Sequence, residues 1–404
     1  MAGSIVSVLS AILKDDYMPP TVEQLNQEVL ITNLLGVNSK DIVGNNAVMA
    51  LHTGRSPGIG ARRELEDLPD AGYQTYARIT YDLKYLYARV QVTGQVMQKT
   101  KNGQGSFVVD VLKDEMTRIK DDLANDLSRQ FYGDGTGAIA TCGTTTTSTT
   151  VNLLSTESLV KGYLYVNLPI DIGTVANPIV VAQNRIIQSV SLSGNGSIVI
   201  SGATVSTTSG THFVFLYNNA DATGNKEIDN GLQKLIPTAA NTVGGINGAT
   251  ATYWDVQRTS LSSGILTYDS MLQMKNKLRQ QGANTSALVT SFGIQRQYFN
   301  ILQSQARYQE PTKLDGGWET LTFEGTPFFA DRHAPFGMMF WIDGRYIQPF
   351  ADGDWRFLEE DGEVIKWVQN KDAWQAALAR YMQLGINRRN VQGLIYSIAD
   401  TAGI

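Results

Sequence analysis

The stretch that decides the fold is YQTYARITYDLKYLYARVQVTGQVMQKT, residues 73–100. Its apolar and polar residues alternate with a period close to two. That is the spacing of a β-strand, because successive side chains point to opposite faces of a sheet. We predict a hairpin here. The side chains available to bury are Tyr76, Ile79, Tyr81, Leu83, Tyr85, Tyr87, Val90 and Val92.

A turn cluster, KNGQG at residues 101–105, separates this segment from a long helical pattern at residues 106–132. Apolar residues recur there mostly at steps of four or eight, as on one face of an α-helix. Three glycines in YGDGTG, residues 132–137, end the pattern. At about 1.5 Å per residue the helix would span roughly 40 Å. A helix and a hairpin this long suit a flat subunit that reaches its neighbours better than a compact enzyme.

The composition limits the class of protein. The 404 residues are too many for one simple core, so we expect two or three lobes. With 18% charged residues and a net charge of −5, the chain has no general attraction for nucleic acid or anionic membranes. Its single cysteine, Cys142, excludes internal disulfides and a cysteine-rich zinc site, and is typical of a reducing compartment. We find no apolar run of 18 residues and no basic leader, so we expect a protein that stays in the cytoplasm where it is made.

Three further segments differ in character. Residues 1–63 suggest an extended arm with one short helix and loops, ending in the locally basic GRSPGIGARRE. Residues 138–227 hold short β-rich runs and few charges, which predicts a small all-β insertion, although residues 144–150 alone could be a flexible linker. From residue 228 on, helices at 268–281 and 292–306 alternate irregularly with strands, and a strand is expected at 227–236. The fold class is therefore α+β.

The sequence offers little chemistry. His52, His212 and His333 lie far apart without acids at ligand spacing, so we interpret them as loop or packing residues. The acidic LEEDGEV at 358–364 lacks the order of a calcium loop and is typical of a hairpin tip. Four tryptophans in the last quarter could stack on carbohydrate, but core or interface packing is favoured; they are Trp341, Trp355, Trp367 and Trp374. We predict no catalytic, cofactor-binding or metal-binding residues.

One motif carries a resemblance. The pattern G-x-P-x-x-x-D-x-x-x-P-x-G follows the two helices and precedes a strand ending at Asp343, before a closing strand–helix–strand segment. It comprises Gly325, Pro327, Asp331, Pro335 and Gly337. Together with the order of arm, hairpin, long helix ending in GDGTG and α+β lobe, it resembles the major capsid protein of tailed double-stranded DNA bacteriophages, with the Hong Kong 97-type (Johnson) capsid fold.

The resemblance implies a division of the chain. Residues 1–63 would be the N-terminal arm, 64–105 the E-loop region, and 106–137 the spine helix of the P-domain. Residues 138–227 would be an inserted β domain on the outer surface, serving stability or decoration. Residues 228–404 would supply the rest of the P-domain and the A-domain.

A long apolar hairpin is an aggregation hazard unless a neighbouring subunit covers it. We therefore take this region as a source of contacts between subunits. The candidate residues are Arg62, Glu64, Arg78, Tyr81, Lys84, Tyr85, Tyr87, Arg89 and Lys99. The resemblance also implies that Lys84, Lys99 and Lys101 could donate isopeptide cross-links, although solvated lysines are the default interpretation.

The function implied is that of a structural virion protein and not an enzyme. Hexamers and pentamers of it would form an icosahedral shell around double-stranded DNA, without sequence-specific binding, membrane or cofactor, after assembly in the host cytoplasm. The short arm implies a separate scaffolding protein or removal of a propeptide, and portal and decoration proteins are further expected partners. The alternatives are a tail-tube protein and a secreted carbohydrate-binding protein, and the long helix argues against the first.

Overall fold

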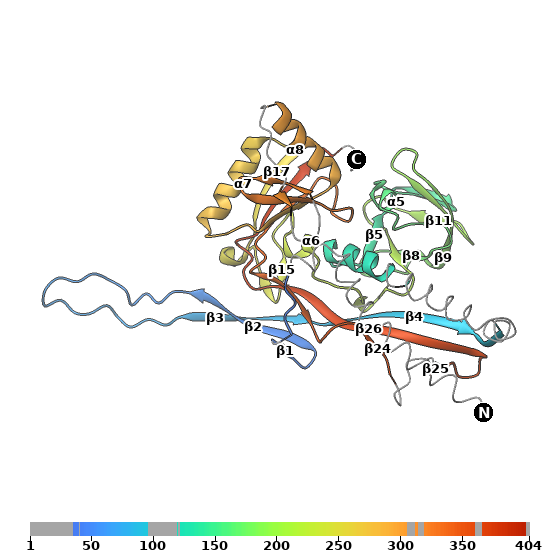
Figure 1. Cartoon of the computed structure of the whole chain (residues 1–404), viewed down its shortest axis with the longest axis horizontal. Helices are drawn as coiled ribbons and strands as arrows, with labels where there is room; N and C mark the ends of the chain where they lie inside the picture. The colour runs from blue at the N-terminus through green and yellow to red at the C-terminus, as the bar shows by residue number, and fades with distance from the viewer. Residues whose placement is uncertain are drawn as a thin grey trace.

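The computed structural model describes residues 35–39, 41–95, 119, 122–304, 312–313, 319–359 and 366–400. In these ranges two lobes stand side by side above a long, narrow β-sheet, and a hairpin projects from one end of the molecule (Figure 1). Strands and helices are both present and strands predominate, so the α+β class is confirmed.

The first lobe is built on a seven-stranded sheet with the order β17-β27-β22-β18-β21-β20-β19, flanked by helices α7 and α8 (Figure 1). Helix α7 begins at a capping box, in which the Thr267 side chain accepts from the Ser270 amide. Both helices and the strand β18 lie where the sequence predicts them. The bounds are β17 Gln257–Gly264, α7 Tyr268–Gln280, β18 Ala287–Thr290, α8 Phe292–Ser304, β19 Thr312–Lys313, β20 Glu319–Phe323, β21 Thr326–Ala330, β22 Met339–Ile342 and β27 Gly393–Ile398.

Aromatic rings fill the core of this seven-stranded lobe. The Tyr298 ring stacks on Phe328 with centroids 4.9 Å apart, and Phe323 meets Trp341 edge to face at 5.8 Å. Trp341 is fully buried and Trp355 is 2% exposed, so both pack in cores, as expected. A carbohydrate-stacking platform of these two tryptophans is thereby excluded.

The second lobe, the β lobe, comprises residues 138–225. A six-stranded sheet of order β5-β12-β8-β9-β10-β7 and the pair β11-β6 enclose a separate aliphatic core. The threonine-rich run forms strands β6 and β7, so the linker interpretation is wrong there. The bounds are β5 Ala138–Thr141, β6 Thr145–Ser148, β7 Thr150–Asn152, α5 Glu157–Val160, β8 Pro169–Gly173, β9 Ala182–Ser191, β10 Ser197–Ile200, β11 Val205–Thr207, β12 Phe213–Leu216, β13 Ala220–Asp221 and β14 Gly224–Asn225.

The long sheet is organised by one strand, β26, which pairs with four others. Its residues are 373–386, part of the segment predicted to be a closing strand–helix–strand. The prediction of a helix is wrong there, because β26 has hydrogen-bonding partners on both edges. This tertiary pairing overrides the helix propensity of AALARYMQL. The bounds are β4 Lys84–Thr93, β23 Ile347–Ala351, β24 Arg356–Phe357, β25 Lys366–Trp367 and β26 Ala373–Ile386.

The projecting hairpin is formed by β2 (Asn46–Gly54) and β3 (Thr75–Asp82), with the short β1 (Ile42–Val43) beside β2. The predicted hairpin of residues 73–100 is therefore wrong, because β3 pairs with β2 while β4 pairs with β26. Only Leu83 separates β3 from β4, too little chain for a reversal, so the backbone runs on from one sheet into the other. Strand β2 lies in the segment assigned to the arm and its loops.

Burial changes phase where the chain changes sheet. Odd positions are buried up to Leu83, and even positions are buried in β4 after it. The buried side chains are Ile79, Tyr81, Leu83, Leu86 and Val90. Tyr85 and Tyr87, predicted to be available for burial, are 48% and 56% exposed, and Tyr76 is 67% exposed.

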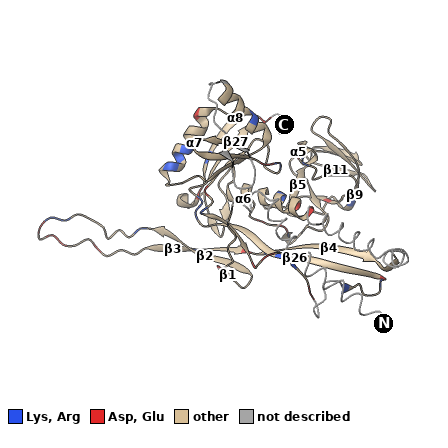
Figure 2. Ribbon diagram, in the orientation of Figure 1, with Lys and Arg blue, Asp and Glu red and all other residues tan. Residues whose placement is uncertain are grey.

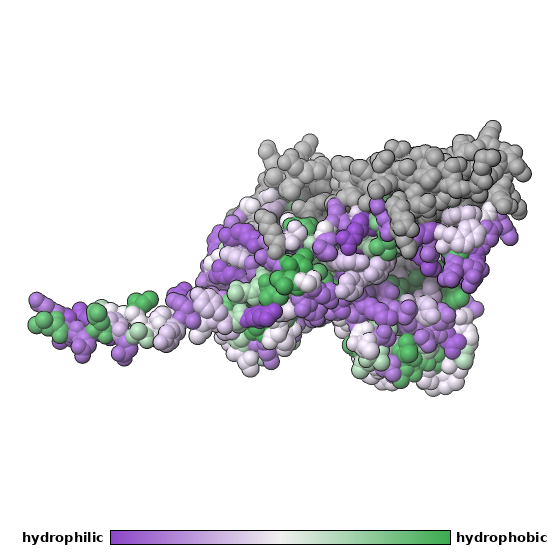
Figure 3. Space-filling model, turned by 90° about the horizontal axis from the view of Figure 1, so that it is seen from below, coloured by the Kyte–Doolittle hydropathy of each residue, from purple (hydrophilic) through white to green (hydrophobic). Residues whose placement is uncertain are grey.

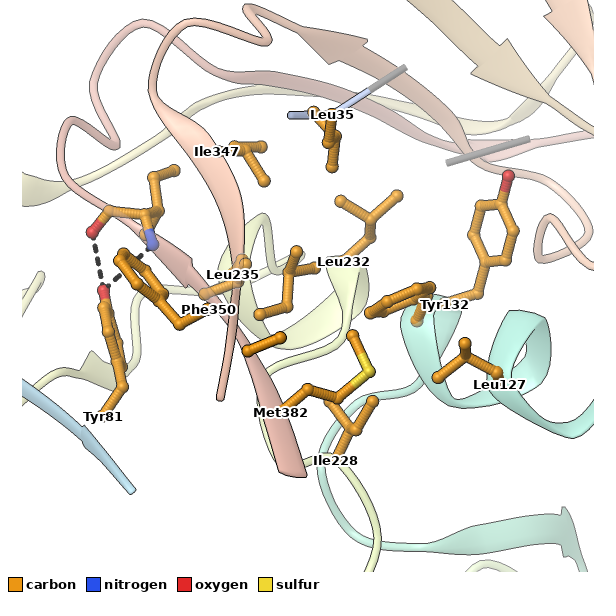
Figure 4. Packing of buried hydrophobic residues seen from close by; sticks show 14 of the residues in the cluster. Leu35, Tyr81, Leu127, Tyr132, Ile228, Leu232, Leu235, Ile347, Phe350 and Met382 are labelled. Carbon is orange, nitrogen blue, oxygen red and sulfur yellow. Dashed lines mark hydrogen bonds between the residues drawn. The ribbon is translucent and has the colours of Figure 1, made fainter. Parts of the chain in front are cut away.

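The parts meet in a central core (Figure 4). The buried Tyr81 hydroxyl donates to the Ile386 carbonyl at 2.7 Å and accepts from the Ile386 amide at 3.3 Å. Helix α6 (Leu232–Leu235) contributes Leu232 and Leu235, where the sequence analysis expects a strand. The remaining short elements are β15 Thr242–Val243, β16 Ile246–Asn247 and the 3-10 helix Thr252–Trp254.

The predicted spine helix is helical at residues 119 and 122–132 and contributes Leu127 and Tyr132 to this core. Residues 106–118 and 120–121 of that prediction lie outside the described residues. The helix ends as predicted, where the Gly133 amide turns back to the Gln130 carbonyl at 3.0 Å. Gly135 follows at φ +87°, a conformation that glycine adopts without strain.

Candidate assembly surface

The hairpin tip, residues 55–74, connects β2 to β3 and extends away from both lobes (Figure 1). Its apolar side chains have no cover: Ile59 is 86% exposed, Leu65 102% and Leu68 84%. Leu65 also has φ +67°, which is costly for a bulky side chain. Exposed apolar side chains gathered on one loop are typical of an interaction site.

Charged residues surround these leucines, and the tip shows hydrophobic and hydrophilic residues interspersed (Figure 3). Arg62 donates to the Asp67 carbonyl at 2.9 Å, and the Arg63 amide donates to the Glu66 carboxylate at 2.9 Å. Glu64 is exposed. These local bonds shape the loop without burying any charge, so both signs remain available to a partner.

A second exposed surface lies on the long sheet, and we name it the aromatic–arginine face: Tyr85, Tyr87, Arg89, Arg356 and Tyr381. Strand register places Tyr85 opposite Tyr381, and places Tyr87 and Arg356 on either side of Ala379. The Tyr85 and Tyr381 rings meet edge to face at 4.9 Å, and the Arg356 guanidinium lies 5.0 Å from the Tyr381 ring centre. Aromatic and arginine side chains of this kind dominate protein interfaces.

The candidate contact residues divide into several groups. Arg62, Glu64, Arg78, Tyr85, Tyr87 and Arg89 are exposed and stay predictions. Tyr81 is a correction: it is 2% exposed, because its ring packs in the central core and its hydroxyl bonds to Ile386. Lys84 is mostly buried and pairs with Asp229 at 2.9 Å, so its amine is engaged within the chain. Lys99 and Lys101 lie outside the described residues.

A different polar cluster, the joint, connects the β lobe to residues 331–337, where the sequence motif lies. At its centre Lys161, 4% exposed, donates to the carbonyls of His333 at 3.2 Å and Ala334 at 2.8 Å and pairs with Glu157 at 2.5 Å. Glu157 also accepts from the Phe336 amide at 3.2 Å. Burial lowers the pKa of Lys161, and Glu157 opposes that effect.

His333 lies beside this lysine and is 9% exposed. Its ring stacks on Tyr163 with centroids 5.7 Å apart, and the Tyr163 hydroxyl lies 2.8 Å from His333 Nδ1. The motif residue Asp331 accepts from the Tyr132 hydroxyl at 2.8 Å, which ties the loop to the end of the spine helix. The packing role predicted for His333 is thus confirmed, while its contact with Tyr163 could not be foreseen.

A buried ion pair completes the joint. Arg129 of the spine helix contacts Glu227 at 2.6 Å and Asp126 at 2.7 Å, and Glu227 also accepts from the Asn219 side chain at 3.0 Å. Burial raises the pKa of Glu227, although Arg129 works in the opposite direction. Through Glu227, these bonds connect Asn219 of the β lobe to the helix.

The histidines and acidic side chains of the described part of the chain are dispersed. No three His, Cys, Asp or Glu side chains gather there as metal ligands would. His52 contacts Gln74, and His212 Nδ1 accepts from the Thr208 amide. None of the described helices has the length and apolar character needed to cross a membrane. Residues 360–365, which hold most of the predicted acidic hairpin tip, lie outside the described residues.

The fold was compared with those of known proteins. No family model matches the sequence, and no curated protein does. A subunit of the cyanophage A-1(L) capsid superposes with a TM-score of 0.58 over 92% of this chain and 93% of that chain, at 14% identity. This chain has the capsid fold. The capsid of an empty GTA particle gives a lower TM-score, 0.48, at 12% identity over 92% of this chain and 97% of that chain. The SrpI encapsulin of Synechococcus elongatus gives 0.46 at 8% identity over 91% of this chain and 86% of that chain.

The capsid fold was expected from the sequence and is confirmed at the level of architecture. The residues that sequence reasoning missed are Leu65, Leu68, Arg356, Tyr381 and Lys161. Of these, only Lys161 left a signal, since its spacing of four from Glu157 is that of a helical ion pair.

Proposed function

We propose that this protein is the major capsid subunit of a tailed double-stranded DNA phage. The observation that carries the proposal is the hairpin tip, whose leucines are exposed in a chain that shares its fold with a cyanophage capsid subunit over 92% of its length. Such a tip gains stability only when a second copy covers it.

The aromatic–arginine face and the hairpin tip are the two surfaces through which copies of the chain meet. They are different patches on one molecule, so a contact between the tip of one copy and the face of the next is heterologous, and such contacts close into rings when the rotation between copies allows it. Hexamers and pentamers are closed rings of this kind. Many modest contacts per subunit then give a shell whose total stability far exceeds that of any one contact.

The remaining roles follow the same proposal. The β lobe is a domain inserted in the capsid fold and lies on the outer surface of the shell, where its sparse charge suits a decoration partner (Figure 2). A scaffolding protein and a portal act during assembly in the host cytoplasm. The mature shell encloses DNA without reading its sequence, the subunit acts without cofactor, and it performs no catalysis.

Electron microscopy of the full-length protein, expressed alone and with its neighbouring genes, tests the proposal. We expect closed shells, sheets or tubes from the natural protein. The double variant Leu65→Ser, Leu68→Ser should stay dispersed, because it removes the exposed apolar contact without touching any core. Leu192→Ser is the matched control, since Leu192 is 59% exposed on the β lobe, away from the tip. Dispersed natural protein under both conditions would overturn the capsid proposal.

A further inference from the structure

We propose that the joint is an acid-sensitive clamp, which holds the β lobe against residues 331–337 while His333 is neutral and loosens when that imidazole gains a proton. The clamp is a property of the folded chain and does not depend on the shell. Its parts are the motif loop, the end of the spine helix and the segment of the β lobe from Glu157 to Tyr163.

The contacts across the joint are specific and few. The Lys161 ammonium donates to two carbonyls of residues 331–337, which we call the motif loop. Arg332 of this loop donates to the Lys161 carbonyl at 2.7 Å. The Lys161 ammonium also lies 5.0 Å from the centre of the Phe336 ring. Each of these contacts connects the β lobe to residues 331–337.

An unperturbed imidazole changes charge nearer to neutral pH than any other type of side chain in this cluster, and His333 is the imidazole here. A neutral imidazole offers one nitrogen as an acceptor, and His333 Nδ1 is placed to accept from the Tyr163 hydroxyl. A protonated imidazole donates from both nitrogens, so this hydrogen bond must reverse. The new charge would also lie beside Lys161 and Arg332 in a mostly buried site.

The charged groups around His333 come from every element packed against it. Lys161 of the β lobe, Arg332 of the loop and Arg129 of the helix disfavour a second cation, while Asp331 favours one. Burial is the largest cause, and together these groups lower the pKa of His333 to about 4. The docked joint therefore prefers the neutral ring.

The sign of the pH dependence follows. A released loop would expose His333 to water and return its pKa to the ordinary value near 6.5. The contribution of neutral His333 to the stability of the docked state is therefore complete above about pH 6.5. It decreases as the pH falls towards about 4 and does not decrease further below that pH. The docking equilibrium shifts on the order of 100-fold over this range.

Other titratable groups at the joint must be separated from this effect. Glu227 acts with the opposite sign, because burial raises its pKa and acid therefore favours the native joint through this carboxyl. Glu157 and Asp331 also accept hydrogen bonds across the cluster. A variant that keeps all three carboxyls and removes only the imidazole isolates the contribution of His333.

Hydrogen–deuterium exchange of the full-length protein at about pH 7 and about pH 4, corrected for the intrinsic rate, tests the clamp. We expect protection of peptides covering 156–164 and 331–338 to fall on the order of 100-fold at acid pH, while strand β10 in the β-lobe core stays protected. His333→Gln should abolish the change, since an amide can bond to Tyr163 but does not titrate. His212→Gln, the matched control on the β lobe, should retain it.

Two outcomes would overturn the clamp: equal protection of the joint at both pH values, or an equal loss in His333→Gln. If circular dichroism shows that His333→Gln is unfolded, Tyr163→Phe gives an independent test. That variant removes the partner of the neutral imidazole, so protection should be lost at a higher pH than in the natural protein. An unchanged pH profile in Tyr163→Phe would likewise contradict the proposal.

Discussion

The β lobe and the hairpin tip place their apolar side chains in opposite ways. The β lobe encloses a core of its own, with Ile172, Ile187 and Ile198 fully buried. The tip has leucines of equal size that are almost wholly exposed, at 102% and 84%. The first region covers its apolar side chains itself, and under the proposed function the second is covered by a neighbouring copy. Changes in the two regions should therefore separate folding from assembly.

The largest effect is expected in the β-lobe core. Ile198→Ala should cost about 3–4 kcal/mol, because it leaves a cavity in a fully buried site. Cys142 reports the loss: it is buried in the same core, and burial raises the pKa of its thiol to about 12, so native protein should resist alkylation near pH 8.

Alkylation of Ile198→Ala should proceed on the order of 100-fold faster than that of the natural protein, since labelling requires the lobe to open. Leu192→Ala, which trims an exposed leucine on the same lobe, should label at the natural rate. Equal rates for the two variants would show that the lobe has no independent core.

A smaller effect is expected where the hairpin joins the central core. Gly385→Ala should destabilise the protein by about 1–3 kcal/mol, because the new methyl would lie 2.4 Å from the Phe350 ring and 2.8 Å from the Tyr81 ring. Urea unfolding measures the loss. Gly36→Ala is the control, with no atom within 4 Å of its added carbon, and a comparable loss there would refute the packing argument.

Tyr81→Phe should cost about 1–2 kcal/mol. It keeps the ring stacked near Phe350 but leaves the buried Ile386 amide and carbonyl without the hydroxyl that bonds to both. Thermal unfolding of Tyr81→Phe beside Tyr76→Phe, whose ring is 67% exposed, checks this. If both variants melt together with the natural protein, the hydroxyl contributes nothing.

The smallest effect on folding is expected at the tip. Leu65→Ser should change the free energy of unfolding by less than about 0.5 kcal/mol, since the leucine contacts nothing in its own chain. The same substitution should impair assembly, which light scattering follows. A large loss of stability with unimpaired assembly would reverse the comparison between the two regions.

Local pattern was enough to predict many elements of the fold. The alternation at residues 75–93, the helices α7 and α8 and the β-rich character of residues 138–227 are written in neighbouring residues, and all appear in the structure. Pairing was not predictable. The partner of β4 is almost three hundred residues away, and nothing in the alternation distinguishes it from a nearer strand.

The candidate site was predicted in part for the same reason. Tyr85, Tyr87 and Arg89 were selected because they lie on an alternating strand, and the structure leaves them exposed. The change of phase at Leu83 depends on the chain passing between two sheets, so the buried Tyr81 could not be told apart from its neighbours. The leucines of ELEDLPD follow no helical or strand period over a useful length and gave no signal.

The register of β4 against β26 has a consequence for synthesis of the chain. Tyr85 pairs with Tyr381, so the ribosome must add roughly 300 residues after β4 before its partner exists. At about 5–20 residues per second this takes roughly 15–60 s. Throughout that interval β4 has two free edges, whereas β2 and β3 are already both made. Both strands of the projecting hairpin are thus synthesised long before the long sheet can form. During this delay, the unpaired strand β4 is the part of the nascent chain that most needs a chaperone.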